Sequence, residues 1–461
     1  MTGRSDVLVL GGGPGGYAAA LYGAAAGRSV TLVEEARVGG TCLHHGCIPA
    51  KELLQTAEVL RAVRGAKAFG IGVDAPTVDL EVSVARKQQV VDRLTKGLEQ
   101  LLGGRSVTVV PGRGEVADVA ARRVRVGDDS FEGDALILAT GSVPRALEGL
   151  PFDGVRVLSS DHVLDRTAIP ESAVIIGGGA IGCEFASFLA DVGSRVTILE
   201  AMPGILPGVD PEAAAIVGRL FKRRKVTVHT GVSVSGGSVT DTGVVVTYEN
   251  DTGPATIEAE IVVVSVGRAP RSGGIGLEGS GIAVDGRGFV EVDGRMRTAV
   301  PGVYAIGDLA PTPALAHVAF AEAIVAIKDI CGEEPEPIDY ARVPWGIYCH
   351  PEVAFCGPTE EAARAAGHDV VTSVHRFAGN SRAQIMGEAD GLVKIVANTD
   401  GVILGVHIVG PWATELLGPG YLAVNWEATV GDLAPLIQPH PTLGELFGES
   451  VLALTGRTLH G

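Results

Sequence analysis

Short apolar runs, glycine-rich turns and one alanine-rich segment alternate over the first 34 residues. An apolar run at 7–10 leads into glycines at 11–16, and the alanine-rich segment that follows ends near Gly27. A second apolar run at 30–33 ends at Glu34. Short apolar runs bounded by glycine are typical of buried parallel strands, and the alanine-rich segment predicts a helix between them. This order of elements predicts a dinucleotide-binding βαβ unit, which consists of a strand, a glycine turn, a helix and a second strand that ends at an acid.

Each glycine of the first turn has a predicted task. Gly11 permits the tight turn, Gly13 beside Pro14 lets a pyrophosphate approach the backbone, and Gly16 lets the helix pack against the strand. The start of the helix then faces the phosphates, because its first N–H groups have no partner within the helix. We expect Glu34 to bind a ribose hydroxyl.

The same unit recurs further along the chain in a constant register. Gly11, Gly13, Gly16, Gly27 and Glu34 are matched by Gly177, Gly179, Gly182, Gly193 and Glu200. Each unit also closes on a similar segment, 140–144 in the first and 266–270 in the second. One such turn could be no more than a glycine-rich loop, whereas two in register predict two dinucleotide sites. Glu200 would repel a 2′-phosphate and no arginine follows it at 201–204, so the second site favours NAD over NADP.

The remaining sequence predicts further elements and a third domain. Residues 83–102 have the spacing of a helix, and 298–308 read as a strand that delivers Asp308 onto a glycine turn. The acidic, proline-rich segment 333–337 is typical of a linker. Beyond it, 341–461 alternates strand-like runs with helices and predicts a separate α+β domain.

Composition excludes several classes of function. The formal charge is −17 and the only basic run is 222–225, which argues against nucleic acid or an anionic membrane as the main partner. No apolar run has the length of a membrane span, and we identify no signal or transit peptide. Six cysteines in 461 residues are too few for a secreted disulfide scaffold, so we expect a reducing, cytoplasmic location.

Two cysteines, Cys42 and Cys47, lie at the predicted start of a helix in the segment GGTCLHHGCIPAK, with Lys51 one turn later. A helix N-terminus favours a thiolate. A metal site is one interpretation because His44 and His45 stand between the cysteines, but four ligands in six residues do not easily reach one tetrahedral centre. A structural disulfide over so short a loop would stabilise weakly. The flanking dinucleotide units favour the third interpretation, a redox-active disulfide beside a flavin, and we predict no metal.

A second candidate lies near the C-terminus, where His440 precedes Glu445 by five residues. A carboxylate behind an imidazole orients the ring and raises its basicity, so the pair could act as a general base. Surface pairs of this kind are common, and the local sequence alone leaves the role open.

These residues together resemble a known family, the flavin-dependent pyridine nucleotide-disulfide oxidoreductases, and in particular its members that oxidise dihydrolipoyl groups. The resemblance spans nearly the whole chain and rests on GGTCLHHGCIPAK, GGGAIGCE, ATGS, TAVPGVYAIGDLA, LAH, YCHPEVAFCG, ILGVHIVG and HPTLGE, in the family's order. It implies an α/β, glutathione reductase-like fold with two Rossmann-like domains and a C-terminal α+β dimerisation domain. The expected divisions are 1–148 for the first part of the FAD-binding domain, 149–270 for the NAD-binding domain, 271–337 for the second FAD or central part, and 341–461 for the dimerisation domain.

The resemblance also implies where the cofactors bind. FAD is expected on Gly11, Gly13, Pro14, Gly16, Glu34, Gly40, Thr41, Lys51, Gly114, Thr140, Gly141, Ser142, Asp308, Leu315, Ala316 and His317. NAD is expected on Gly177, Gly179, Ile181, Gly182, Glu200 and Gly267. Lys51, paired with Glu184, would lie against the flavin ring.

The implied activity is oxidation of dihydrolipoyl groups with reduction of NAD by a homodimer. Cys42 would exchange with the substrate and Cys47 would face the flavin, while His440 and Glu445 would come from the other subunit. The implied partner is a lipoyl-bearing acyltransferase of a 2-oxo acid dehydrogenase complex or a glycine cleavage carrier protein. Alternatives are an NAD(P)H-dependent reductase of another small disulfide and a docking flavoprotein with little turnover.

The chain departs from the family's pattern between the cysteines, where an asparagine and an apolar residue are usual. A charged His44 or His45 would lower the pKa of the nearby thiol; the alternative is that both rings point away.

Overall fold

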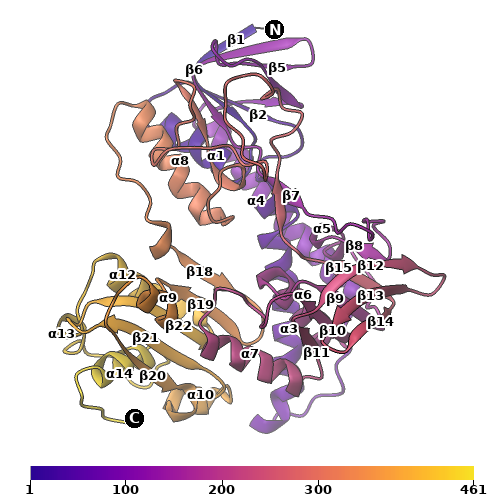
Figure 1. The fold of residues 1–461 in the computed structure, drawn as a ribbon, viewed down its shortest axis with the longest axis vertical. Helices are drawn as coiled ribbons and strands as arrows, with labels where there is room; N and C mark the ends of the chain where they lie inside the picture. Colours follow the sequence, from indigo (N-terminus) through magenta and orange to yellow (C-terminus); the bar gives the residue numbers. More distant parts are fainter. Residues whose placement is uncertain (1, 461) are drawn as a thin grey trace.

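A seven-stranded sheet forms the first of three layered units in the computed structural model, which describes residues 2–460. Residues 1 and 461, the outer bounds of the first and last predicted domains, lie outside that part. The sheet runs in the order β3 (Thr108–Pro111), β2 (Val30–Glu34), β1 (Thr2–Leu10), β6 (Asp129–Leu138), β5 (Arg123–Val126) and β4 (Gly114–Asp118), and β17 (Val303–Ala305) also pairs with β6. Its β1, β2, β3, β6 and β17 are parallel, as the apolar runs predict. Helices α1 (Pro14–Ala25) and α8 (Ala316–Ile330) pack together beside it (Figure 1).

The second unit repeats this parallel arrangement. Its sheet runs β11 (Thr227–Thr230), β10 (Arg195–Glu200), β9 (Ser172–Ile176), β15 (Ile261–Val264) and β8 (Val157–Leu158). The unit also contains the helices α5 (Ser160–Val163), α6 (Ala180–Val192) and α7 (Pro211–Arg223). A separate antiparallel sheet consists of β12 (Ser233–Val239), β13 (Val244–Asn250) and β14 (Gly253–Ala259). The two units are joined where their closing segments pair, β7 (Ser142–Pro144) with β16 (Arg268–Pro270).

The third unit is a C-terminal α+β domain, the fold class expected for this part of the chain. Its five-stranded sheet runs β18 (Pro344–Ile347), β19 (Glu352–Cys356), β22 (Ile403–Gly410), β21 (Leu392–Asn398) and β20 (Val370–Arg376). Helix α14 (Glu445–Ala453) packs on β20 and β21. The shorter helices are α9 (Glu360–Ala365), α10 (Ser381–Met386), α11 (Ala413–Leu416), α12 (Gly418–Asn425) and α13 (Val430–Leu433).

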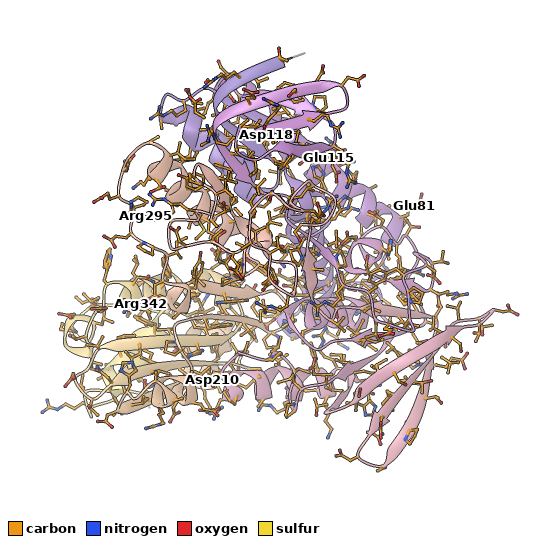
Figure 2. The ribbon with its side chains drawn as sticks, turned by 45° about the horizontal axis from the view of Figure 1, so that its top comes forward. Glu81, Glu115, Asp118, Asp210, Arg295 and Arg342 are labelled. Carbon is orange, nitrogen blue, oxygen red and sulfur yellow. The ribbon has the colours of Figure 1, made fainter. Side chains whose placement is uncertain are left out.

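A buried ion cluster attaches this domain to the second unit. Lys394 on β21 is 4% exposed, and its Nζ lies 3.1 Å from Asp210 Oδ2 and 2.9 Å from Glu212 Oε1 at the start of α7. Figure 2 places Asp210 where the two units meet. Because a buried charge without a partner costs several kcal/mol, the cluster holds the two units in one relative position.

The helix that carries the cysteine pair differs from its predicted form. Two helices replace the single one: α2 (Gly40–His44) contains Cys42, and α3 (Cys47–Gly65) begins at Cys47. Helix α2 ends with the bond from the His45 N–H to the Thr41 carbonyl oxygen at 2.8 Å, and the break before α3 lies at Gly46, which takes a non-helical conformation. Helix α3 packs on α6 and on α4 (Leu80–Gly104), which is slightly longer than the predicted 83–102. None of the helices within residues 2–460 has both the length and the apolar content to span a bilayer.

Candidate active site

A cavity of about 550 Å³ extends from the start of α1 to the start of α3. Its walls include Gly11, Gly13, Pro14, Glu34, Gly40, Thr41, Lys51, Gly114, Thr140, Gly141, Ser142, Asp308, Leu315 and Ala316, all expected at the flavin site. Two expected residues are not among its lining residues. Gly16 packs against the turn instead, since an added Cβ would lie 1.7 Å from the Gly11 carbonyl oxygen. His317 directs Nε2 to the Pro344 carbonyl oxygen at 2.8 Å.

One end of the cavity has the geometry of a phosphate site. No side chain caps the start of α1, so its free N–H groups face the cavity. A Cβ on Gly13 would meet nothing nearer than the Gly40 Cα at 3.9 Å, which leaves room for a ligand against the backbone. Glu34 is held beside this turn because its Oε2 accepts a hydrogen bond from the Gly12 N–H at 2.6 Å. An uncapped helix start, open space and an anchored acid fit one half of a dinucleotide.

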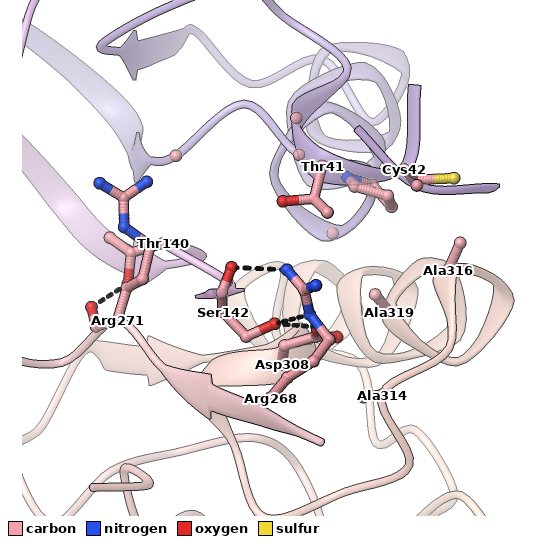
Figure 3. A pocket seen from close by; sticks show the side chains of 18 of the residues that line it. Thr41, Cys42, Thr140, Ser142, Arg268, Arg271, Asp308, Ala314, Ala316 and Ala319 are labelled. Carbon is pink, nitrogen blue, oxygen red and sulfur yellow. Dashed lines mark hydrogen bonds and ion pairs between the residues drawn. The ribbon is translucent and has the colours of Figure 1, made fainter. Parts of the chain in front are cut away.

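Polar side chains from both Rossmann-like units meet in the middle of the cavity (Figure 3). Ser142 Oγ donates to Asp308 Oδ2 at 2.5 Å, and Arg268 Nε donates to Ser142 Oγ at 2.7 Å. Arg271 lies nearby, with its guanidinium 2.5 Å from a Glu35 carboxylate oxygen. Sequence reasoning missed Arg268 and Arg271, although both lie in or directly after the closing segment of the second unit. The repeat marks the two closing segments as equivalent, but it gives no signal that they pair with each other.

The two thiols differ in their pKa values. The Cys42 thiol donates a hydrogen bond toward Cys47, which lowers the pKa of Cys47 to about 7 despite its desolvation, and the charge of Lys51 acts in the same direction. The same hydrogen bond, together with burial, raises the pKa of Cys42. Cys47 is open to the cavity at the first turn of α3, whose N–H groups also favour a thiolate. In the reduced pair the negative charge therefore resides on Cys47.

Lys51 supplies the positive charge of the cavity. Its Nζ donates to both carboxylate oxygens of Glu184 at 2.8 Å, joining α3 to α6. Burial alone would lower the pKa of Lys51, but the Glu184 carboxylate outweighs it and the pKa is raised. Lys51 is therefore a cation at neutral pH, as the predicted pairing with Glu184 requires.

The second glycine turn reproduces the first. No side chain caps the start of α6, and a Cβ on Gly182 would lie 1.9 Å from the Gly177 carbonyl oxygen. A Cβ on Gly179 would meet nothing within 4 Å. Glu200 Oε2 accepts from the Gly178 N–H at 2.5 Å, matching Glu34 at the first turn. Ile181 and Gly267, also expected at the NAD site, line the cavity itself, so the two dinucleotide sites adjoin.

The predicted pair of His440 and Glu445 is in contact, but His440 does not line the cavity that holds the thiols of its own chain. His440 Nδ1 is 2.8 Å from Glu445 Oε1, and the Thr442 N–H donates to Glu445 Oε2 at 2.8 Å. Burial would raise the pKa of Glu445, but the Thr442 N–H and His440 together lower it, so the carboxylate is ionised. The His440 side chain is 69% exposed. Among residues 2–460, those that line the cavity do not include His440. One chain thus contains both halves of the predicted centre without bringing them together.

The histidines between the cysteines differ from each other. His44 Nε2 is 3.0 Å from the Val38 carbonyl oxygen, and burial lowers the pKa of His44, so its ring is neutral near pH 7. It therefore supplies no positive charge to the thiols. His45 is exposed and lines the cavity. No group of three or more His, Cys, Asp or Glu side chains that could hold a metal ion is found in residues 2–460.

The shared proton gives a pH-dependent signature. In the reduced protein we expect Cys47 to titrate at about pH 7, with the thiolate present above that pH and lost below it. In Cys42→Ala the Cys47 pKa should rise toward its ordinary value, because the hydrogen bond that lowers it is gone. Carbon-13 NMR of labelled cysteine Cβ atoms, assigned with Cys47→Ser, measures both values. Identical Cys47 titrations in the wild-type protein and Cys42→Ala would contradict this account.

The open space at Gly179 gives a separate test of the second turn. Gly179→Ala should fold and retain FAD, because the added methyl group meets no protein atom, yet it should weaken NADH binding at least about tenfold by obstructing the pyrophosphate. Gly97→Ala on α4, also with nothing within 4 Å, is the matched control and should bind NADH normally. NADH titration by calorimetry measures the difference, and equal affinities would exclude a pyrophosphate at Gly179.

Comparisons with known proteins agree with this geometry. The family model for pyridine nucleotide-disulphide oxidoreductases matches residues 5–323, and the model for the dimerisation domain of these enzymes matches residues 343–451. Dihydrolipoyl dehydrogenase of Bacillus subtilis is 40% identical, covering 99% of this chain and 99% of its own, and that of Thermus scotoductus is 42% identical, covering 99% and 98%. Among solved structures, LpdA of Mycobacterium tuberculosis has a TM-score of 0.91 at 29% identity, covering 98% and 99%. The HOCl-induced flavoprotein disulfide reductase RclA of Escherichia coli has a TM-score of 0.86 at 26% identity, and the match covers 97% of this chain and 99% of RclA. The chain belongs to the pyridine nucleotide-disulphide oxidoreductase family.

Proposed function

We propose that this chain is a dihydrolipoyl dehydrogenase, which oxidises dihydrolipoyl groups to the lipoyl disulfide and reduces NAD. One observation carries the proposal. The Cys42–Cys47 pair opens into a cavity that begins at one dinucleotide turn and adjoins a second, with Lys51 and Glu184 between them. FAD and NAD are the cofactors of the family, and the relatives named dihydrolipoyl dehydrogenase match this chain over nearly its full length.

The dithiol step is assigned to Cys42, Cys47 and His440. His440 Nε2 takes a proton from one dihydrolipoyl thiol, since Nδ1 is engaged by Glu445. The resulting thiolate attacks Cys42 of the Cys42–Cys47 disulfide, and Cys47 leaves as a thiolate stabilised by Lys51 and the start of α3. The second substrate thiol then displaces Cys42, which keeps that proton as a thiol, while the lipoyl disulfide departs. The proton on His440 passes to solvent.

FAD, held in the cavity, would supply the two-electron chemistry that links the reduced cysteine pair to NAD. The chain's own residues prepare this transfer. The phosphates are assigned to the uncapped starts of α1 and α6, Glu34 and Glu200 to the two adenosine riboses, and Asp308 with Ser142 to the flavin side chain. Glu200 and the absence of a cation after it favour NAD over NADP.

The family's dimerisation domain supports a homodimer, and we assign the base to the opposite subunit. His440 is exposed in one chain and absent from that chain's cavity, which agrees with a centre completed across the interface. The lipoyl-bearing acyltransferase of a 2-oxo acid dehydrogenase complex, or a glycine cleavage carrier protein, is the proposed partner. The divisions 1–148, 149–270, 271–337 and 341–461 remain our proposed domain bounds.

A substrate panel tests the proposed function. We expect rapid turnover with dihydrolipoamide and NAD, little with NADP, and little reduction of glutathione disulfide by NADH. Cys47→Ser should abolish lipoamide turnover with FAD still bound, because no disulfide can form, and His440→Gln should lower it at least about a hundredfold. Cys331→Ser, at a cysteine outside the cavity, is the matched control and should be active.

Three results would contradict the proposal. Faster turnover of another small disulfide would identify a different reductase. An FAD-loaded protein with no turnover would indicate a docking subunit. Full lipoamide turnover in Cys47→Ser would eliminate the disulfide step.

A further inference from the structure

Helix α6 carries three buried polar side chains on one face. Glu184, Ser187 and Asp191 are 8%, 0% and 6% exposed, and their spacing of three and four residues places them in one row along the helix. Buried polar groups require partners. These partners come from α3, from the segment 348–350 that follows β18, and from Arg224 at the end of α7.

The segment 348–350 is fastened along this row by its backbone. The Tyr348 N–H donates to Glu184 Oε1 at 2.9 Å, and the His350 N–H donates to Ser187 Oγ at 3.0 Å. Arg224 binds the His350 carbonyl oxygen at 2.8 Å. The C-terminal domain therefore contacts the second Rossmann-like unit at Glu184 itself, the partner of Lys51. This contact fixes the position of the Tyr348 backbone.

Helix α3 is fastened to the same row at its far end. Arg61 Nη1 lies 2.5 Å from Asp191 Oδ2, and Arg64 donates to the Asp191 carbonyl oxygen at 2.6 Å. Since Lys51 pairs with Glu184 at the near end, α3 and α6 are joined at two points about two helical turns apart. The backbone of Lys51 is thus fixed, and the remaining freedom lies in its four-carbon side chain.

The ring of Tyr348 limits that freedom. Lys51 Nζ lies over the ring, 4.8 Å from its centroid, while both Glu184 oxygens accept from the same ammonium. An ammonium has three N–H donors, and an aromatic face attracts the cation without taking a strong hydrogen bond. Glu184 occupies two donors and the ring covers one side, so the third is left for the cavity that Lys51 lines.

We propose that Tyr348 is a positioning residue that holds the Lys51 ammonium toward the flavin. This role rests on the proposed function only in assigning FAD to the cavity. A correctly placed cation stabilises negative charge that develops on the ring system nearby. When the ring is removed, Lys51 can turn toward solvent, the bound FAD becomes harder to reduce, and transfer from the cysteine pair slows.

The experiment compares Tyr348→Phe with Tyr348→Leu in the FAD-loaded dimer. Phenylalanine keeps the aromatic face, so the kcat of Tyr348→Phe should stay within about twofold of the wild-type value. The reduction equilibrium of FAD, measured as the midpoint potential, should likewise change by no more than about twofold. Leucine removes the face, and we expect kcat to fall about tenfold with little change in KM for NAD. The same tenfold change corresponds to a potential more negative by about 30 mV for a two-electron couple.

A second background keeps the test specific to Lys51. In Lys51→Met, the further change Tyr348→Leu should not move the potential, because the ring has no cation left to hold. FAD content and dimer mass confirm folding, and Tyr348→Met replaces the leucine variant if the latter fails to assemble.

Equal potentials in Tyr348→Phe and Tyr348→Leu would overturn the role of Tyr348, as would a leucine effect that persists in Lys51→Met. These readings are independent of the substrate. A wild-type protein inactive on lipoamide but with the expected potential shifts would refute the proposed function and leave the role of Tyr348 intact.

Discussion

The ion pair between Lys51 and Glu184 ties α3, which begins at Cys47, to α6, which starts at the second dinucleotide turn. The pair is largely shielded from water, so loss of either partner would leave the other charge poorly solvated. Cys47 lies one helical turn before Lys51, and the ammonium helps to lower its pKa. The position of Cys47 between the two dinucleotide turns therefore depends on the Lys51–Glu184 ion pair more than on the short segment around the cysteines.

Each chain contains both parts of the proposed reaction centre but holds them apart. The thiols lie in a cavity between the Rossmann-like units, whereas His440 is exposed on the C-terminal domain with its carboxylate partner behind it. The C-terminal domain also contributes to the cavity of its own chain, through Trp345 in the lining and Tyr348 beside Lys51. One domain thus contributes to the cysteine site of its own subunit and, in the homodimer that we propose, presents the base to the other.

The features that were predictable from sequence are those with short local causes. Gly11, Gly16 and Glu34 are set by a turn, a close helix contact and a strand end, and their repeat at constant spacing identified the second unit. Arg268 could not be found in this way, because its bond to Ser142 joins positions 126 residues apart and depends on the pairing of β7 with β16. The single helix expected at the cysteines became two because Gly46 takes a non-helical conformation between them. The pairing of Lys51 with Glu184 came from family resemblance, since no local pattern links α3 to α6.

The central claim is that the cysteine pair of one subunit works with the histidine of the other, and mixed dimers test it most directly. Homodimers of Cys47→Ser and of His440→Gln should each have little or no activity, but coexpression places one intact centre in every mixed dimer if the base acts across the interface. Random pairing makes half of the dimers mixed, so the account predicts recovery of about a quarter of wild-type lipoamide turnover. Turnover no higher than that of the parent variants, in a sample shown by mass spectrometry to contain mixed dimers, would contradict it.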